Sequence, residues 1–336
     1  MVRRFLLAAL GLATTLMSVD ALAEGRADMP VDARAWLARV HEAASLRNYQ
    51  GTQVFTAGGV VSSSRIAHYC DGSQQYERVD MLDGQMRRVF RHNDTVYTVW
   101  PQRQIAVVEQ REPLPPFPAL LQAGGDRLTE YYELMSQGSD RLAGYDAEVF
   151  LLKPRDALRF GQRLWAERST GLLLRTDVLG AHGEVLESSA FSEVAIGVRA
   201  QPETVLQPMK KLEGYRVVRP AVTATQLEGE GWAMKQGVPG FRQISCVKRP
   251  LTAGLPDVGR NAGPAEVLQT IFSDGLTHVS LFIEPFDSQR HQRPMHTAVG
   301  ATHTLMQRQG EWWITVVGDV PTSTLKQFAG ALERRK

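Results

Sequence analysis

Histidines, carboxylates and cysteines supply most catalytic and metal sites, but their spacing in this chain matches no such site. The segment His41-Glu42-Ala43-Ala44-Ser45 is similar to the zinc-protease helix motif, yet Ser45 stands where the second histidine ligand is needed. His291, His296 and His303 lie close in sequence without a cysteine or a well-spaced carboxylate, which favours solvated histidines over metal ligands. We therefore expect no metal site.

Motifs for nucleophilic or cofactor chemistry are also missing from the sequence. The chain has no Gly-x-Ser-x-Gly elbow, no phosphate-cradling glycine loop and no dinucleotide fingerprint. It carries 38 Lys and Arg against 36 Asp and Glu, a net charge of +2, which lacks the basic bias of nucleic-acid binding. These observations predict a binding protein that is not an enzyme, uses no cofactor and binds no nucleic acid.

The N-terminus has the features of a secretory signal peptide. Arg3 and Arg4 precede an apolar run from Phe5 to Met17, and Ala21-Leu22-Ala23 presents small residues where a signal peptidase cuts. The run is shorter than the roughly 20 apolar residues that span a bilayer. The sequence thus predicts a signal peptide over residues 1–23 and export of the mature chain.

An oxidising compartment makes the two cysteines relevant. Cys70 and Cys246 fall in strand-like stretches of the two halves of the chain, so a disulfide between them would staple the halves together. Alternatively they are separate buried thiols that pack as small hydrophobes, which is the more common role. The sequence favours the second alternative but does not exclude the first, because it gives no distance between the two Cα atoms.

The first part of the mature chain, residues 24–197, is predicted to be a curved antiparallel sheet around one helix. Helical spacing of apolar residues over 30–47, after a capping Asp32, predicts the helix. Proline-rich residues 113–118 predict a loop, and 128–135 a short helix. Alternating patterns between tight turns predict ten strands, at 49–55, 60–69, 75–82, 85–91, 96–100, 104–109, 147–153, 162–167, 172–179 and 185–194. A sheet of this size must curl to bury one face, which predicts an incomplete barrel with an apolar interior.

A change in composition predicts where the second domain begins. Residues 198–220 are rich in proline and lysine, which predicts an extended basic linker. Residues 221–336 then form a smaller α+β domain. Its predicted elements are strands at 242–247 and 278–284, a helix at 264–272 that opens with proline, a hairpin of 300–307 with 311–317, and a final helix at 321–332. The fold class is therefore α+β.

Apolar residues of the first domain raise the question of a ligand cavity. Phe55, Trp100 and Ile105 fall in strands around the predicted helix, and Phe117 and Leu121 follow the proline-rich loop. They either line a cavity for acyl chains beneath a lid or form an ordinary packed core, which is the more frequent outcome. The pattern alone does not decide between the two.

The whole mature sequence resembles the RseB/MucB family of periplasmic sigma-E regulatory proteins. The resemblance rests on short motifs in a fixed order across both domains rather than on a catalytic signature. They are Trp36-Leu37, Asn48 to Thr52, Leu82-Asp83-Gly84, Thr170 to Leu174, Gly231-Trp232, Pro239-Gly240-Phe241, Phe272 to Leu276, Val279 to Glu284, Gly300-Ala301-Thr302 and Thr315 to Pro321.

This resemblance implies a fold, a location and partners. It implies a first domain similar to the lipoprotein carriers LolA, LolB and LppX, and a periplasmic protein that binds the periplasmic segment of an anti-sigma factor of the RseA/MucA type. Such binding would shield that segment from proteolysis, keep the envelope-stress sigma factor inactive, and end when lipopolysaccharide or lipoprotein acyl chains bind. A homo-oligomer is also implied. The alternative function is that of a LolA-like carrier of lipid or lipoprotein.

Two groups of residues are then the candidates for binding. For lipid we expect Phe55, Trp100, Ile105, Phe117 and Leu121, because an apolar hollow stabilises an acyl chain by roughly 0.8 kcal/mol per buried CH₂ group. For the protein partner we expect Arg216, Arg219, Phe241 and Arg242. Lys210 and Lys211 add to the basic character of the linker, which either attracts acidic groups or is merely solvated.

Overall fold

The computed structural model describes residues 32–110, 128–250, 266–291 and 293–335. The predicted signal peptide, the proline-rich segment, Phe117 and Leu121 lie outside these ranges. Among the described residues, no helix combines the length and the apolar character needed to cross a membrane.

Helix α1, Ala33–Leu46, confirms the predicted N-terminal helix. The Asp32 side chain caps it by accepting hydrogen bonds from the backbone N–H groups of Arg34 and Ala35, at 3.0 and 3.2 Å. One face of the helix is buried, and its residues recur at helical spacing: Trp36, Leu37, Val40, Ala43 and Ala44.

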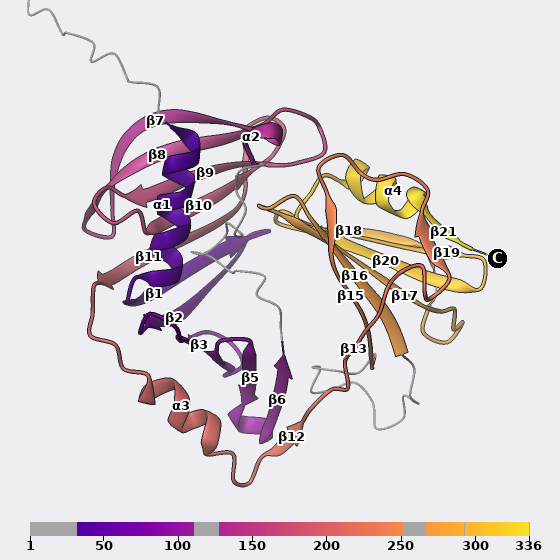
Figure 1. Ribbon diagram of the computed structural model, residues 1–336, viewed down its shortest axis with the longest axis horizontal. Helices are drawn as coiled ribbons and strands as arrows, with labels where there is room; N and C mark the ends of the chain where they lie inside the picture. The colour runs from indigo at the N-terminus through magenta and orange to yellow at the C-terminus, as the bar shows by residue number, and fades with distance from the viewer. Residues whose placement is uncertain (1–31, 111–127, 251–265, 292, 336) are drawn as a thin grey trace, which may run out of the picture. The chain divides into compact units, whose positions relative to one another are not determined.

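A sheet of twelve strands curves around this helix (Figure 1). Its first half is the predicted meander of β1 (Tyr49–Ala57), β2 (Val60–Cys70), β3 (Gln75–Met81), β4 (Arg88–His92), β5 (Thr95–Trp100) and β6 (Ile105–Gln110). Its second half is β7 (Tyr132–Leu142), β8 (Tyr145–Pro154), β9 (Gly161–Glu167), β10 (Leu173–Leu179) and β11 (Val185–Ile196). Pairing of β1 with β11 joins the halves, and the edge strands β12 and β7 leave the sheet open, so the expected incomplete barrel is confirmed.

The residues of the predicted linker form regular structure. Helix α3, Glu203–Lys210, packs on β3 and β4, on the face of the sheet opposite to α1. Strand β12, Arg216–Val218, then adds to the first sheet as a parallel neighbour of β6. The expectation of an extended linker was therefore wrong for α3, because Val205, Leu206 and Met209 give this short segment an apolar side that the sheet buries.

The second domain is a seven-stranded sheet covered by helix α4, Thr322–Ala331. The strand order is β13 (Thr223–Ala224), β15 (Arg242–Pro250), β16 (Glu266–Ser273), β17 (His278–Pro285), β20 (Trp312–Gly318), β19 (Thr302–Gln309) and β18 (Met295–Val299). Strands β14 (Trp232–Met234) and β21 (Leu332–Arg334) pair separately. The predicted hairpin and final helix are confirmed.

Two predicted helices are corrected by the structure. Residues 266–273 form the central strand β16, which pairs with β15 and β17; a strand buried on both faces has a continuous apolar run that its period cannot distinguish from a helix. The predicted helix at 128–135 ends at Tyr131 as α2 (Leu128–Tyr131), and β7 begins at Tyr132. Aromatic residues at this point favour the strand.

Candidate functional site

The α1 face, meaning the side of the first sheet on which α1 packs, is a packed core where the helix covers it. The Trp36 ring lies 4.5 Å from the Phe150 ring, and its Nε1–H donates to Glu148 at 3.2 Å. The same cluster includes Tyr49 and Ile66 from the first two strands. Of the two alternatives from the sequence, a ligand cavity or a packed core, the packed core therefore describes the part of the sheet under α1.

Beyond the helix, the α1 face becomes polar. The antiparallel register places Gln53, Ser62 and Ser64 on this face, and Ser189 and Thr176 follow on the neighbouring strands. The buried Thr176 Oγ1 and Gln162 Oε1 atoms have no hydrogen-bond partner among the described residues. The expectation of a uniformly apolar interior was thus wrong, because serine and threonine alternate with the apolar residues at the hairpin ends of these strands.

Two of the predicted lipid residues lie together on the α1 face. Trp100 and Ile105 are cross-strand partners in β5 and β6, each 8% exposed, and they form one cluster with Val107. The described residue that packs against this cluster is Val218 of β12. Phe55 is half-buried on the same face but in β1, where its register partners are Ser62 and Ser189, so it does not join the cluster.

The same strand β12 brings the predicted partner residues close to this apolar cluster. Arg216 is the register partner of Ile105, and its backbone N–H donates to the Gln104 carbonyl at 2.7 Å. The Arg216 and Arg219 side chains are exposed. Strand β12 and the residues that follow it, called the connector below, therefore pack Val218 against the cluster that contains Trp100 and Ile105 and present arginines to solvent.

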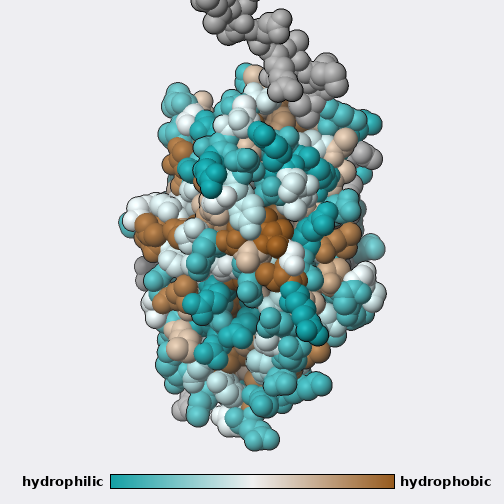
Figure 2. All heavy atoms as spheres, turned by 90° about the vertical axis from the view of Figure 1, so that its left-hand side faces the viewer, coloured by the Kyte–Doolittle hydropathy of each residue, from teal (hydrophilic) through white to brown (hydrophobic). Residues whose placement is uncertain are grey.

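Cavities lie elsewhere on the first domain. One of 530 Å³ lies beside the N-terminal end of α3 and has a mixed lining of charged, polar and apolar residues, among them Arg65, Glu193 and Ile66. A second, of 330 Å³, lies at the β1–β2 turn beside Gly58, and Gly300 of the second domain also lines it. Seen from the side of the first domain, hydrophobic side chains form separate patches among hydrophilic ones (Figure 2). That view shows no continuous apolar surface for lipid.

The turn between β16 and β17 connects the two domains. It runs from Ser273 to Thr277, and its Leu276 side chain is buried in the same cluster as α1, together with Leu128 and Tyr132. Asp274 Oδ1 holds the turn by accepting hydrogen bonds from the Leu276 and Thr277 N–H groups, at 3.0 and 2.9 Å. A residue of the second domain thus completes the core of the first.

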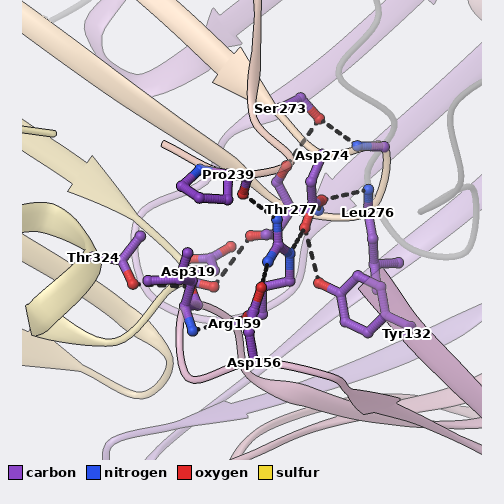
Figure 3. A network of polar contacts seen from close by, with 12 residues as sticks. Tyr132, Asp156, Arg159, Pro239, Ser273, Asp274, Leu276, Thr277, Asp319 and Thr324 are labelled. Atoms are coloured by element: carbon purple, nitrogen blue, oxygen red, sulfur yellow. Dashed lines mark hydrogen bonds and ion pairs between the residues drawn. The ribbon is translucent and has the colours of Figure 1, made fainter. Parts of the chain in front are cut away.

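A buried ion pair secures this turn (Figure 3). Arg159 Nε donates to Asp274 Oδ2 at 2.7 Å, and neither side chain is exposed to solvent. The Tyr132 hydroxyl donates to the same Asp274 oxygen, Oδ2, at 3.0 Å. Arg159 also donates to the Pro239 carbonyl at 2.6 Å and pairs with Asp156. Its guanidinium therefore joins three segments of the chain.

The electrostatics of this network follow from burial. Burial, and then the neighbouring Asp274 carboxylate, raise the pKa of Tyr132 well above its ordinary value, so its hydroxyl stays a donor. Burial works to lower the pKa of Arg159, but its ion pair and hydrogen bonds with Asp274 outweigh it and raise the pKa overall. Both groups thus keep the protonation states that the hydrogen bonds require.

Further contacts join the domains away from this network. Arg249 of β15 donates to Glu109 of β6 at 3.0 Å, and Thr324 Oγ1 of α4 donates to the Leu158 carbonyl at 2.9 Å. Burial, and then the Asp319 carboxylate, raise the pKa of Glu187 in β11 to about 7, although a hydrogen bond from the Ala301 N–H opposes the shift. Ionisation of Glu187 therefore affects the contact between the two domains.

Comparison with known proteins covers both domains. Residues 32–209 match the MucB/RseB N-terminal domain, and residues 226–333 match the MucB/RseB C-terminal domain. The chain belongs to the MucB/RseB family.

Individual relatives are distant but match over nearly their full length. The sigma factor AlgU regulatory protein MucB of Pseudomonas aeruginosa is 29% identical over 334 residues, which cover 94% of this chain and 95% of the relative. The sigma-E factor regulatory protein RseB of Escherichia coli K12 is 23% identical over 319 residues, with coverage of 94% and 95%. A crystal structure of MucB in complex with MucA(peri) is 25% identical with a TM-score of 0.66, and covers 91% of this chain and 100% of that chain.

The candidate residues Phe241, Arg242, Cys70 and Cys246 of this MucB/RseB family member differ in exposure. Arg242 is exposed at the start of β15, whereas Phe241 is 7% exposed, packs on the Phe328 ring and lies under Arg159. A buried ring offers a partner little surface, so Phe241 contributes to the core. Cys70 and Cys246 are both free thiols, the first half-buried in the first sheet and the second buried in the second sheet.

Sequence reasoning also misjudged or missed several residues of this site. His291 was expected to be solvated but is 7% exposed and stacks on Trp313 at 4.8 Å. Arg159, Tyr132 and Asp274 were not proposed as an interdomain network. The one signal was the Phe272 to Leu276 motif that carries part of the MucB/RseB resemblance, because a turn that is a family motif without catalytic residues suggests a structural contact.

Proposed function

We propose that this member of the MucB/RseB family is a periplasmic regulatory protein that binds the periplasmic segment of a MucA/RseA-type anti-sigma factor. Binding shields that segment from proteolysis, and lipid binding releases it. The observation that carries the proposal is the match to both family domains in their order, together with similarity to the solved complex of MucB with MucA(peri).

Exposed arginines support the contact with the anti-sigma factor. Arg216 and Arg219 lie on and directly after β12, and Arg242 opens β15. Arginine side chains attract acidic groups of a partner and speed association, in a way that salt screens. We assign the partner surface to these three residues and not to Phe241.

The Trp100–Ile105 pair supports lipid sensing. Val218 packs against the cluster that contains this pair, so an acyl chain that takes the place of Val218 would gain apolar contacts with the cluster while it frees β12 from β6. Freeing β12 moves Arg216, which pairs with Ile105. Lipid and partner thus favour different positions of β12. Such a difference in affinity for the two positions is what allows lipid to release the partner.

Binding of the purified mature chain, residues 24–336, to the periplasmic segment of its cognate anti-sigma factor tests the first part. We expect binding by isothermal titration calorimetry, protection of the segment from its initiating protease, and loss of both when lipopolysaccharide or a triacylated lipopeptide is added. Arg216→Glu with Arg219→Glu should weaken binding by at least tenfold. Arg141→Glu, an equal change on exposed β7, should leave it intact.

Two outcomes would contradict this function. Absence of binding by the lipid-free chain rejects the regulatory role altogether. Binding that persists at saturating lipid rejects sensing, while transfer of lipoprotein between membranes without any anti-sigma factor would favour a carrier instead.

A further inference from the structure

The 530 Å³ cavity beside α3, called the α3 cavity below, lies on the face of the first sheet opposite to α1 and to the candidate lipid pair. Ala67 and Tyr69 identify this face, because both line the cavity and both belong to the apolar packing around Val205 of α3. The volume falls in the range of small-molecule sites, roughly 300–1,000 Å³. The cavity is therefore large enough for a ligand that takes no part in the proposed binding of lipid and anti-sigma factor.

Small side chains create the α3 cavity. On the face that α3 covers, successive register partners on β11, β1 and β2 are Ala195, Gln50 and Ala67. Two of these three are alanines, so the row leaves space that longer side chains would fill. Gln201 and Thr204, just before and within the first turn of α3, also line this space. The uncharged part of the lining thus combines two methyl groups with hydrogen-bonding amides and a hydroxyl.

The neighbouring row of register partners brings charges to the cavity. Its members on β11, β1, β2 and β3 are Glu193, Thr52, Arg65 and Asp80, and all four line the cavity. Thr52 Oγ1 donates to Glu193 Oε1 at 2.8 Å. Glu193 Oε2 therefore remains available, since no described residue donates to it.

Arg65 also remains available, although it lies opposite a carboxylate. Arg78 Nε donates to Asp80 Oδ2 at 2.8 Å, and Arg88 lies 3.7 Å from the other oxygen, Oδ1. Arg65 itself is exposed and forms no ion pair with a residue that the structure describes. The α3 cavity thus offers one uncompensated cation, Arg65, and one carboxylate with an unused oxygen, Glu193.

We propose that the α3 cavity binds a short peptide with free ends, its carboxylate at Arg65 and its amino group at Glu193. A guanidinium donates two parallel hydrogen bonds to a carboxylate, and an ammonium group donates to the unused Glu193 oxygen. Strand β1 separates β2 from β11, so the backbones at these two residues lie roughly 10 Å apart. An extended tripeptide spans about 10 Å. A single amino acid is too short to reach both charges.

The rest of the lining favours a peptide over a ligand of one charge sign. Gln50, Gln201 and Thr204 can donate to and accept from the peptide groups between the two ends. The two alanines leave room for small side chains. A purely anionic ligand would meet Glu193 as a like charge, and a purely cationic one would meet Arg65. An internal segment of a protein has neither free end, so we assign the cavity to peptides of about three small residues.

Isothermal titration calorimetry of the mature chain, residues 24–336, with tri-alanine tests the site. We expect binding that weakens about tenfold when the peptide carboxylate is replaced by an amide, and about tenfold when the amino group is acetylated. Alanine and penta-alanine should bind more weakly than tri-alanine, because their charges are too close or too far apart. O-phosphoethanolamine, the zwitterion of a lipid head group, has closer charges and should also bind more weakly.

Two variants assign each end of the peptide. Arg65→Gln should weaken tri-alanine binding about tenfold and remove the preference for tri-alanine over its amide, while the preference over the acetylated peptide remains. Glu193→Gln should have the reverse effect on the two preferences. Arg87→Gln and Glu133→Gln are the controls, because they remove exposed charges of the same sheet outside the cavity and should keep both preferences. Selective loss of one preference distinguishes a lost contact from a disturbed fold.

Any of four results would overturn the proposal. The first is no binding of tri-alanine at millimolar concentration, and the second is equal affinity for free and end-blocked peptides. The third is retention of both preferences by Arg65→Gln and Glu193→Gln. The fourth is tighter binding of O-phosphoethanolamine than of tri-alanine, which would assign the cavity to a lipid head group instead.

Discussion

Arg216 of the connector and Ile105 of the first sheet are register partners in the parallel pair of β12 and β6. One residue is a candidate contact for the protein partner and the other for lipid. Because the two share a single short ladder, a ligand that separates the strands at Ile105 must also displace Arg216. The proposed release of the partner therefore requires separation of only the three residue pairs that join β12 to β6.

Shortening Val218 should make this connector easier to displace. Val218→Ala removes methyl groups that pack against the cluster of Trp100, Ile105 and Val107, which weakens the attachment of β12 to the sheet by about 1 kcal/mol. We expect half-release of the anti-sigma segment at roughly a fivefold lower lipopeptide concentration, measured by fluorescence anisotropy of a labelled segment. Val222→Ala, the same change at a 44% exposed position, is the control. An unchanged midpoint for Val218→Ala would separate lipid sensing from β12.

Removing the charge of Asp274 should loosen the contact between the domains. Asp274→Asn leaves the buried Arg159 without its fully buried carboxylate partner, a change that costs about 3 kcal/mol where a second, partly exposed carboxylate, here Asp156, remains. Urea unfolding should show this loss and a separation of the two domain transitions. Glu333→Gln, which breaks the exposed pair with Lys235, should cost less than about 1 kcal/mol. Equal losses would show that the buried pair contributes no more than a surface pair.

A methyl group at Gly240 should disrupt the same network from the other side. Gly240 has φ of 85°, and an added Cβ would lie 2.0 Å from Arg159 Nη2. We expect Gly240→Ala to lower the free energy of unfolding by at least about 1 kcal/mol from the backbone conformation alone, with a further loss as Arg159 moves. Gly237→Ala in the same loop meets no atom within 4 Å and should change stability by less than about 0.5 kcal/mol. Similar effects of the two substitutions would contradict the tight packing around Arg159.

Glu187 should make stability fall as the pH rises toward neutrality. Burial and Asp319 raise the pKa of this carboxyl from 4.5 to about 7, so the folded chain binds its proton more readily than the unfolded chain does. The associated stability is fully present below pH 4.5 and is lost as the pH rises through about 7. Glu187→Gln cannot ionise, so its melting temperature should gain on that of the unchanged chain across this window. The exposed Glu213→Gln should show no such gain; if both behave alike, ionisation of Glu187 does not strain the contact.

Local patterns predicted the strands of the first sheet well, because tight turns separate short alternating runs such as 60–69 and 96–100. They failed at β16, where burial on both faces hides the period, and at β7, which continues directly from a helical turn. The apolar pair Trp100 and Ile105 was found from composition and position. The Arg159–Asp274 pair was not, because 115 residues separate its members in sequence and only the folded topology brings them together.

The burial of Leu276 within the first domain also determines what a truncated protein would be. If the chain is cut in the connector, residues 24–197 lose a side chain that fills space beside Leu128 and Tyr132. The fragment then has an apolar opening that is absent from the intact molecule, and detergents or fatty acids can bind there. Amphiphile binding by the isolated fragment would therefore report on the cut surface as much as on a natural site.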